Sequence, residues 1–364
     1  MRLIGTPLHL PLYRVQRFFG DGPLLPASYT FSVVTACNAR CRTCRSYDRA
    51  VGQLGVDEYD RIARSIRQRG FWLTLTGGEP LVRRDLADLV DALVRGIRPR
   101  LVTLPTNGSF PDRVKDVVGR LAARWPSVHF VANVSLDEIG PRHDELRGLP
   151  GSFDLAIETL RALRTIGARN LTIGINTVVS RFNAARFPEV CDGLLALEPE
   201  SYVVEIAQDR MELGMAGAGL APSHAEWSRA RAHLRDRLRS RRTTALARLI
   251  ATLRDDYYRR VEHELGGRKG GRACLAATAS AFVAPDGEVL ACGVRGESLG
   301  RLAEADYDFP TVWHGERARS VRRRIADDRC SCSLANQAYL DLAADPFAVL
   351  RLIMRSTGIG ITSS

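Results

Sequence analysis

Short apolar runs alternate with longer amphipathic stretches along the first 210 residues. Six runs have strand character, at residues 33–34, 73–75, 101–104, 130–132, 171–173 and 202–204. Between them apolar side chains recur every three or four positions, as at Tyr59, Ile62 and Ile66, which predicts amphipathic helices. Strands that alternate with helices predict parallel βα units. Six such units predict an α/β fold with an open, partial (β/α)6 barrel, because a closed barrel has eight.

The pattern changes near residue 211. Glycine and proline are frequent from Gly214 to Pro222, as in a linker. The pattern over residues 223–263 predicts arginine-rich helices with one packed face, and a flexible basic joint follows at 266–271. A small α+β unit follows, with two short strands around the Asp286-Gly287 turn and a helix at about 316–326. We therefore divide the chain into four parts. They are an N-terminal extension (1–28), the partial barrel (29–210), a helical arginine-rich linker (211–272) and a cysteine-bearing unit with a tail (273–364).

Composition narrows the classes of partner and compartment. The chain has 364 residues and a formal net charge of +11, yet lysine occurs only at Lys115 and Lys269. An excess of arginine over lysine is a weak sign of a phosphate-binding surface, so we expect no nucleic-acid partner. The sequence contains no run of about 18 apolar residues, so we expect no membrane span. Residues 1–20 lack the apolar core of a signal peptide. We expect a cytoplasmic protein whose eight cysteines serve metal rather than disulfides.

Three cysteines lie within eight residues, at Cys37, Cys41 and Cys44. Three thiolates hold three irons of a [4Fe–4S] cluster and leave the fourth iron open for another ligand. Structural zinc sites usually pair their cysteines as Cys-x2-Cys with a second pair further on, and the Cys-x3-Cys-x2-Cys spacing does not fit that pairing. The spacing favours a catalytic cluster over a zinc site that awaits a distant ligand, or over chance.

Five further segments have the residue types and order of a known family: Phe31–Thr35, Thr76–Pro80, Thr106–Gly108, Ser135–Asp137 and His143–Gly148. Together with the three cysteines they resemble the radical S-adenosylmethionine (radical SAM) superfamily, over residues about 29 to 210. Phe31–Thr35 resembles the first barrel strand of that family, and Thr76–Pro80 its glycine-rich SAM-binding motif. Thr43 departs from the family, which usually has an aromatic residue there that often touches the adenine.

The resemblance implies a [4Fe–4S] cluster whose open iron binds SAM, which is cleaved to a 5′-deoxyadenosyl radical. Glu79 would accept the methionine ammonium in a charge-assisted hydrogen bond, and Gly77 and Gly78 would let the backbone approach the ligand closely. From residue type alone, the glycine-rich motif could equally form a simple turn. The other residues implied to contact SAM could equally have surface or helix-capping roles. The contacts implied for ribose, adenine and the methionine carboxylate are Asn107, Ser135, Asp137 and Arg147.

The C-terminal unit contains four more cysteines, Cys274, Cys292, Cys330 and Cys332. With Trp313, their spacing resembles the Twitch or SPASM extension of some radical SAM enzymes, although those endings lack Cys-x-Cys as the last pair. Four thiolates suffice for one fully ligated auxiliary [4Fe–4S] cluster, and zinc stays open as the alternative. Such a cluster has no open iron, so the resemblance implies that it takes or relays an electron, or holds the unit together.

Two other residues bear on the reaction. Glu205 lies in the segment Val203–Ala207 on the sixth predicted strand, where a buried carboxylate requires a polar interior. It is our candidate for SAM binding or for deprotonating the substrate. Pairing of Glu205 with an arginine is the alternative. Cys191 lies in a predicted helix outside the barrel, where a packed core cysteine is favoured over a hydrogen-atom donor.

We expect a radical SAM enzyme that abstracts hydrogen from a small polar substrate of the sugar, aminocyclitol or nucleoside type. Oxidation is favoured because the auxiliary cluster would accept the second electron. The alternatives are epimerisation and the modification of a ribosomal peptide. Peptide-modifying enzymes often have an N-terminal recognition domain, and only about 30 residues precede the first strand here, so that reaction requires a separate recognition protein. A non-catalytic iron–sulfur or zinc protein is the alternative of another class. The expected electron donor is a reductase, a flavodoxin or a ferredoxin.

Overall fold

The computed structural model describes residues 10–20, 22–239, 245–268, 273–328, 330 and 332–357. Nine of its strands form one sheet in the order β6-β5-β4-β3-β2-β1-β7-β8-β9. Adjacent strands from β6 to β7 pair in parallel, whereas β8 and β9 are antiparallel to their neighbours. The strands are β1 (Ser28–Ser32), β2 (Trp72–Thr76), β3 (Leu101–Thr106), β4 (His129–Ser135), β5 (Leu171–Val179), β6 (Ser201–Ile206), β7 (Ser280–Val283), β8 (Glu288–Leu290) and β9 (Ser298–Arg301).

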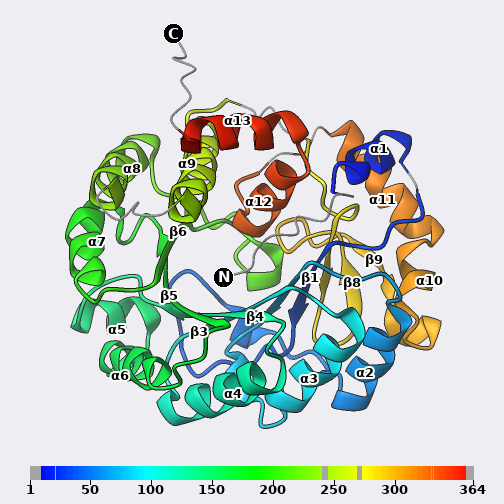
Figure 1. The fold of residues 1–364 in the computed structure, drawn as a ribbon, viewed down its shortest axis with the longest axis horizontal. Helices are drawn as coiled ribbons and strands as arrows, with labels where there is room; N and C mark the ends of the chain where they lie inside the picture. The colour runs from blue at the N-terminus through cyan, green and yellow to red at the C-terminus, as the bar shows by residue number, and fades with distance from the viewer. Residues whose placement is uncertain are drawn as a thin grey trace.

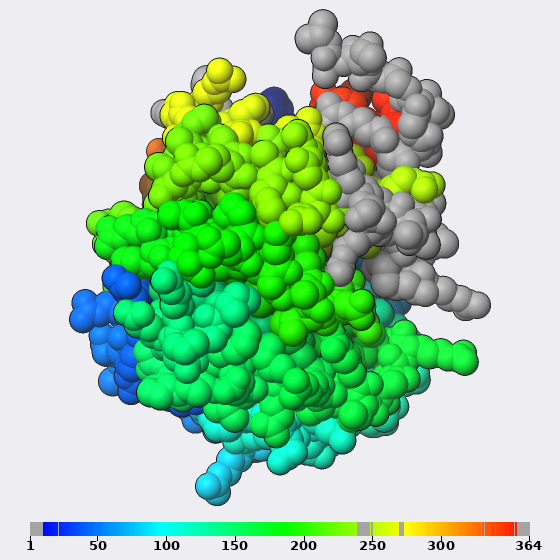
Figure 2. Space-filling view, turned by 90° about the vertical axis from the view of Figure 1, so that its left-hand side faces the viewer, coloured from blue at the N-terminus to red at the C-terminus, as the bar shows by residue number. Residues whose placement is uncertain are grey.

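Helices cover the outside of the curved sheet (Figure 1). The helices are α1 (Leu12–Phe19), α2 (Val56–Ser65), α3 (Leu86–Ile97), α4 (Pro111–Arg124), α5 (Pro141–Arg147), α6 (Ser152–Arg164), α7 (Phe187–Leu195), α8 (His224–Arg239), α9 (Ala245–Leu265), α10 (Phe309–Trp313), α11 (Glu316–Asp327), α12 (Ala335–Ala343) and α13 (Pro346–Thr357). Figure 2 shows the face on which the chain runs from α5 and α6 through α7 to α8. Helix α8 packs against both α7 and α9, and Arg254 of α9 forms hydrogen bonds with Tyr202 and Ser201 of β6.

Side chains alternate between the two faces of the strands, as β6 shows. Val204 and Ile206 are buried in the core between the sheet and the helices, where a fully buried valine contributes about 2 kcal/mol. Ser201, Val203 and Glu205 line the barrel interior instead. The same two-residue period therefore builds an apolar outer layer and a partly polar inner face.

The predicted partial barrel is confirmed, with six parallel strands that do not close on themselves. The position expected for the first strand is wrong, because that strand spans Ser28–Ser32 rather than Phe31–Thr35. Val33 and Val34 are buried, but they belong to the segment that leaves the sheet toward the cysteines. Their apolar character reflects burial within that segment, and sequence alone does not distinguish such burial from strand pairing.

The C-terminal unit continues the barrel sheet. Strand β7 pairs in parallel with β1, from Ser28 opposite Ser280 to Phe31 opposite Val283. The hairpin expected at Asp286-Gly287 is present between β7 and β8, and α11 agrees with the helix expected there. The linker helices α8 and α9 are also present, whereas residues 240–244 and residues 269–271 of the basic joint lie outside the described residues. The division of the chain into four parts stays a prediction.

None of the helices in the described part of the chain combines the length and the apolar character needed to cross a bilayer.

Candidate SAM and iron–sulfur sites

Backbone hydrogen bonds hold the three-cysteine loop at the carboxyl ends of the barrel strands. On one side Gly78 N–H donates to the Val34 carbonyl at 2.7 Å, and Glu79 N–H donates to the Ala36 carbonyl at 3.0 Å. On the other side Arg40 N–H donates to the Arg147 carbonyl at 2.9 Å. The loop is thereby fixed between the segment after β2 and the end of α5.

Glycines allow these close approaches. A Cβ atom at Gly77 would lie 2.2 Å from the Val34 carbonyl oxygen, and one at Gly78 would lie 2.2 Å from that of Ala36. Gly77 also has a φ of +133°, which disfavours other residues. The motif therefore needs its glycines to make room for the cysteine loop itself, a reason that the sequence does not reveal.

Gly148→Ala is expected to remove most of the iron of the barrel cluster. Gly148 has a φ of +57°, and a Cβ atom there would lie 2.4 Å from the Arg40 carbonyl oxygen, one residue before Cys41. Gly151→Ala is the matched control, because Gly151 has a φ of +75° but a Cβ atom there would meet no other atom within 4 Å. Both variants carry about 1 kcal/mol of backbone strain. Equal iron content in the two reconstituted variants would contradict this account of the loop.

Glu79 is buried, with 1% of its surface exposed. Its carboxylate accepts hydrogen bonds from Asn107 N–H at 2.6 Å, from the Thr106 hydroxyl at 2.9 Å and from Leu81 N–H at 3.1 Å. Burial raises the pKa of Glu79, and these hydrogen bonds oppose that shift. Glu79 thus ties β3 to the loop after β2, and its contact with the methionine ammonium stays a prediction.

Asp137 and Arg147 form a buried ion pair beside the cysteines, with 2.8 Å between Oδ2 and Nη2. Asp137 also accepts a hydrogen bond from Val178 N–H at 2.8 Å, and Arg147 Nη1 lies 3.9 Å from Cys41 Sγ. Burial raises the pKa of Asp137, and the charge of Arg147 opposes that shift. The Nε atom of Arg147 is buried and has no hydrogen-bond partner. This Nε–H group remains available to a ligand, although the charge of the Arg147 guanidinium is already matched by Asp137.

The predicted SAM residues surround one cavity of about 190 Å³, which we call the cluster cavity. The wall contains Cys37, Cys41 and Cys44 and every residue predicted to contact SAM, including Ser135. The Asn107 amide is partly engaged, because it donates to Asn38 Oδ1 at 2.9 Å. Tyr47 lines the same cavity as Thr43 and was not predicted. The sequence signal that could have identified Tyr47 was the presence of an aromatic residue three positions after Cys44. The donor set of three thiols and polar groups fits a cluster with SAM.

The four C-terminal cysteines also come together. Cys274 N–H donates to the Cys330 carbonyl at 3.2 Å, and a hydrogen bond with Cys330 together with burial raises the pKa of Cys274. Burial raises the pKa of Cys292, and it raises the pKa of Cys332 to about 12. Metal binding must therefore displace protons from these thiols. The structure brings together all four residues that the sequence proposed as ligands.

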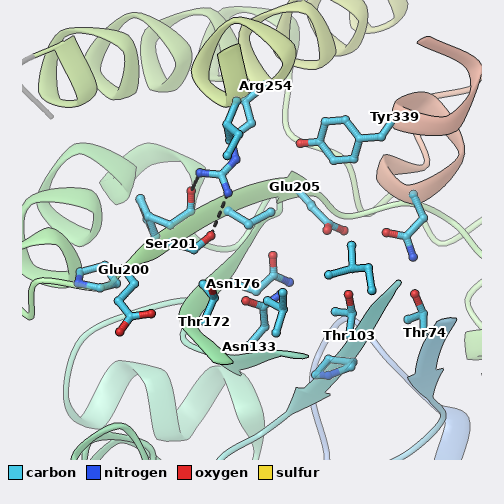
Figure 3. Close-up of a pocket in the computed structure, with 18 of the residues that line it drawn as sticks. Thr74, Thr103, Asn133, Thr172, Asn176, Glu200, Ser201, Glu205, Arg254 and Tyr339 are labelled. Carbon is cyan, nitrogen blue, oxygen red and sulfur yellow. Dashed lines mark hydrogen bonds between the residues drawn. The ribbon is translucent and has the colours of Figure 1, made fainter. Parts of the chain in front are cut away.

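A larger cavity of about 570 Å³ fills the barrel interior, and we call it the interior cavity (Figure 3). Glu205 projects into it from β6, and burial raises the pKa of this carboxyl while the charge of Arg210 opposes the shift. Arg210 lines both the interior cavity and the cluster cavity, and its Nη1 lies 2.8 Å from Glu212 Oε1. Arg210 also borders a small cavity beside Cys292. The sequence did not identify it, because one arginine among many has no distinguishing signal.

Cys191 lies on α7 and is fully buried in the core outside the sheet. The prediction of a packed core cysteine is confirmed. It is absent from the walls of both cavities.

Comparison with known proteins agrees with this arrangement. Residues 31–192 match the Radical SAM superfamily, and residues 274–333 match SPASM, an iron–sulfur cluster-binding domain. An AdoMet-dependent heme synthase of Oleidesulfovibrio alaskensis is 26% identical over 85% of this chain and 80% of its own length. A GTP 3′,8-cyclase of Rhodopseudomonas palustris is 31% identical over 56% of this chain and 58% of its own length.

Solved structures of other proteins share the fold of this chain. Streptococcus suis SuiB has a TM-score of 0.61 at 15% identity and covers 86% of this chain and 71% of its own. The anSMEcpe protein with bound AdoMet has a TM-score of 0.60 at 15% identity and covers 92% of this chain and 100% of its own.

Proposed function

The chain belongs to the radical SAM superfamily and has a SPASM-type C-terminal unit, and we propose that it oxidises a small polar substrate of the sugar, aminocyclitol or nucleoside type. The observation that carries this proposal is the interior cavity. Its volume of about 570 Å³ lies in the range of small-molecule sites, and most of its polar groups are neutral. Thr74, Thr103 and Asn133 are examples, and they suit hydroxyl and amide groups of a ligand.

The position of the interior cavity relative to the SAM residues supports the same reaction. Thr76, Pro105 and Arg210 line both the interior cavity and the cluster cavity. A substrate held inside the barrel therefore lies next to SAM bound at the cysteines. When bound, SAM with the barrel cluster supplies a radical that abstracts one hydrogen atom, and the auxiliary cluster supplies an acceptor for one electron.

Glu205 is our candidate for the proton acceptor. Loss of one hydrogen atom, one proton and one electron converts an alcohol into a carbonyl, so the oxidation needs a base as well as the two cofactors. The carboxylate of Glu205 faces the interior cavity, and a raised pKa makes it a stronger base. An epimerase needs a hydrogen-atom donor instead, and Cys191 lies outside both cavities.

Product analysis in deuterium oxide tests the proposed reaction. The substrate is first identified by deuterium transfer from labelled sugars, aminocyclitols or nucleosides into 5′-deoxyadenosine. We then expect Glu205→Gln to lower oxidised product about 100-fold, within the range for loss of a general base, while 5′-deoxyadenosine still forms. Cys191→Ala is expected to retain most activity. Solvent deuterium at the reacting carbon, together with an inactive Cys191→Ala variant, would favour epimerisation over oxidation.

A further inference from the structure

One arginine faces the interior cavity without an acidic partner. Arg254 extends from α9 toward β6, where its Nη1 donates to the Tyr202 carbonyl at 2.9 Å and its Nη2 donates to the Ser201 hydroxyl at 2.8 Å (Figure 3). Both acceptors are neutral. Among the residues that the structure describes, no carboxylate lies within 4.0 Å of the Arg254 guanidinium, and three of its five N–H donors have no partner.

Nearby arginines of α8 and α9 are neutralised by carboxylates. Arg231 pairs with Asp255 at 3.2 Å, Arg259 pairs with Asp255 at 3.3 Å, and Arg260 pairs with Asp341 at 3.2 Å. A partly buried charge without a counter-charge is costly. Arg254 therefore differs from Arg259 and Arg260 of the same helix, which both pair with a carboxylate.

A second group points to the same place. The Tyr339 side chain reaches the interior cavity from α12, with its hydroxyl directed toward Arg254 (Figure 3). That hydroxyl oxygen is buried and has no hydrogen-bond partner. Burial raises the pKa of Tyr339 and the charge of Arg254 opposes the shift, which places the two groups within electrostatic reach. An unmatched cation and an unused donor thus converge from two different helices.

We propose that Arg254 and Tyr339 bind an anionic oxygen group of the substrate, either a carboxylate or a phosphate. This inference rests on the proposed function and narrows its substrate class to acidic or phosphorylated polyols and nucleotides. The polar wall agrees with such a ligand, because the Oδ1 atoms of Asn133 and Asn176 and the Thr74 hydroxyl are buried without partners and suit ligand hydroxyl groups. The carboxylate of Glu205 would repel the anion, so the anion binds near Arg254 and the reacting carbon faces Glu205.

Binding of three matched probes tests the inference. Glucose, glucuronate and glucose 6-phosphate are titrated calorimetrically into the reconstituted full-length protein with SAM. The wild type is expected to bind at least one of the two anions about tenfold or more tightly than glucose, as for a charge-assisted contact. The two anions distinguish a carboxylate site from a phosphate site. Arg254→Gln is expected to abolish the preference, and Arg254→Lys is expected to retain part of it.

Arg259→Gln is the matched control, because it removes the same charge from the same helix outside the cavity wall. If Arg254 had a purely structural role, Arg254→Gln would weaken the binding of all three probes equally. The ratio of the anion affinity to the glucose affinity therefore separates anion binding from a structural role. Absence of an anion preference in the wild type, or a preference that survives Arg254→Gln, overturns the inference. SAM cleavage is measured separately, because its absence in the wild type would refute the proposed function. The ratio of probe affinities would still decide whether Arg254 and Tyr339 bind an anion.

Discussion

Replacing Cys37, Cys41 and Cys44 together by alanine is expected to lower the iron content from about eight to about four per chain and to abolish SAM cleavage. These three thiols lie on the wall of the cluster cavity, and the other four predicted cluster cysteines gather in the C-terminal unit. Loss of the triplet therefore removes one centre and leaves the other. Iron and sulfide analysis gives the iron content per chain, and 5′-deoxyadenosine measured after anaerobic reduction gives the extent of SAM cleavage.

Cys191→Ala is the control for the triple variant. Cys191 is buried in the core on α7 and belongs to neither group of ligands, so the variant is expected to keep all of its iron at a modest cost in stability. SAM cleavage at the wild-type rate by the triple variant would refute the assignment of the catalytic cluster.

Cys292→Ala is expected to lose the second cluster and all substrate oxidation, while some uncoupled SAM cleavage remains. Cys292 borders a small cavity that it shares with Arg210 and Thr76, and both of these residues also line the interior cavity. An auxiliary centre at Cys292 is therefore adjacent to the proposed substrate, whereas the cluster cavity keeps its own three thiols. Iron analysis and product measurement on one preparation separate the two effects.

The same Cys191→Ala variant controls for the loss of a thiol. Zinc in the wild-type C-terminal unit, with no iron there, would refute the electron-acceptor role. Full oxidation by Cys292→Ala would show that the auxiliary centre only holds the unit together.

The sequence predicted those parts of the site whose chemistry lies in short segments. Cys37 to Cys44 and Gly77 to Glu79 can be interpreted from spacing and residue type, because each segment is built by neighbours along the chain. Arg254 and Tyr339 are different, since they come from two helices far apart in the sequence and meet only across the interior cavity. Helical periodicity indicates which face of α9 is packed, but it does not show that Arg254, unlike Arg259 and Arg260, has no carboxylate within 4.0 Å.

Long-range pairing limited the prediction of the fold in the same way. The alternation of strands and helices predicted the parallel barrel, because each βα unit is a local pattern. Nothing in residues 28–32 indicates that β1 has β7 as its second neighbour, and the buried Val33 and Val34 shifted the expected strand by three residues. Register between distant strands depends on backbone hydrogen bonds that leave no local signature.

The pairing of β1 with β7 also has a consequence for how the protein matures. Because the ribosome makes the N-terminal part first, β1 is synthesised long before Ser280 to Val283. Until then one edge of β1, the strand that leads directly to the cysteine loop, has unpaired backbone groups, and such edges promote aggregation. Contacts so distant in sequence form slowly. We therefore expect the nascent barrel to need protection by a chaperone, and the first cluster to be inserted only after β7 has paired with β1.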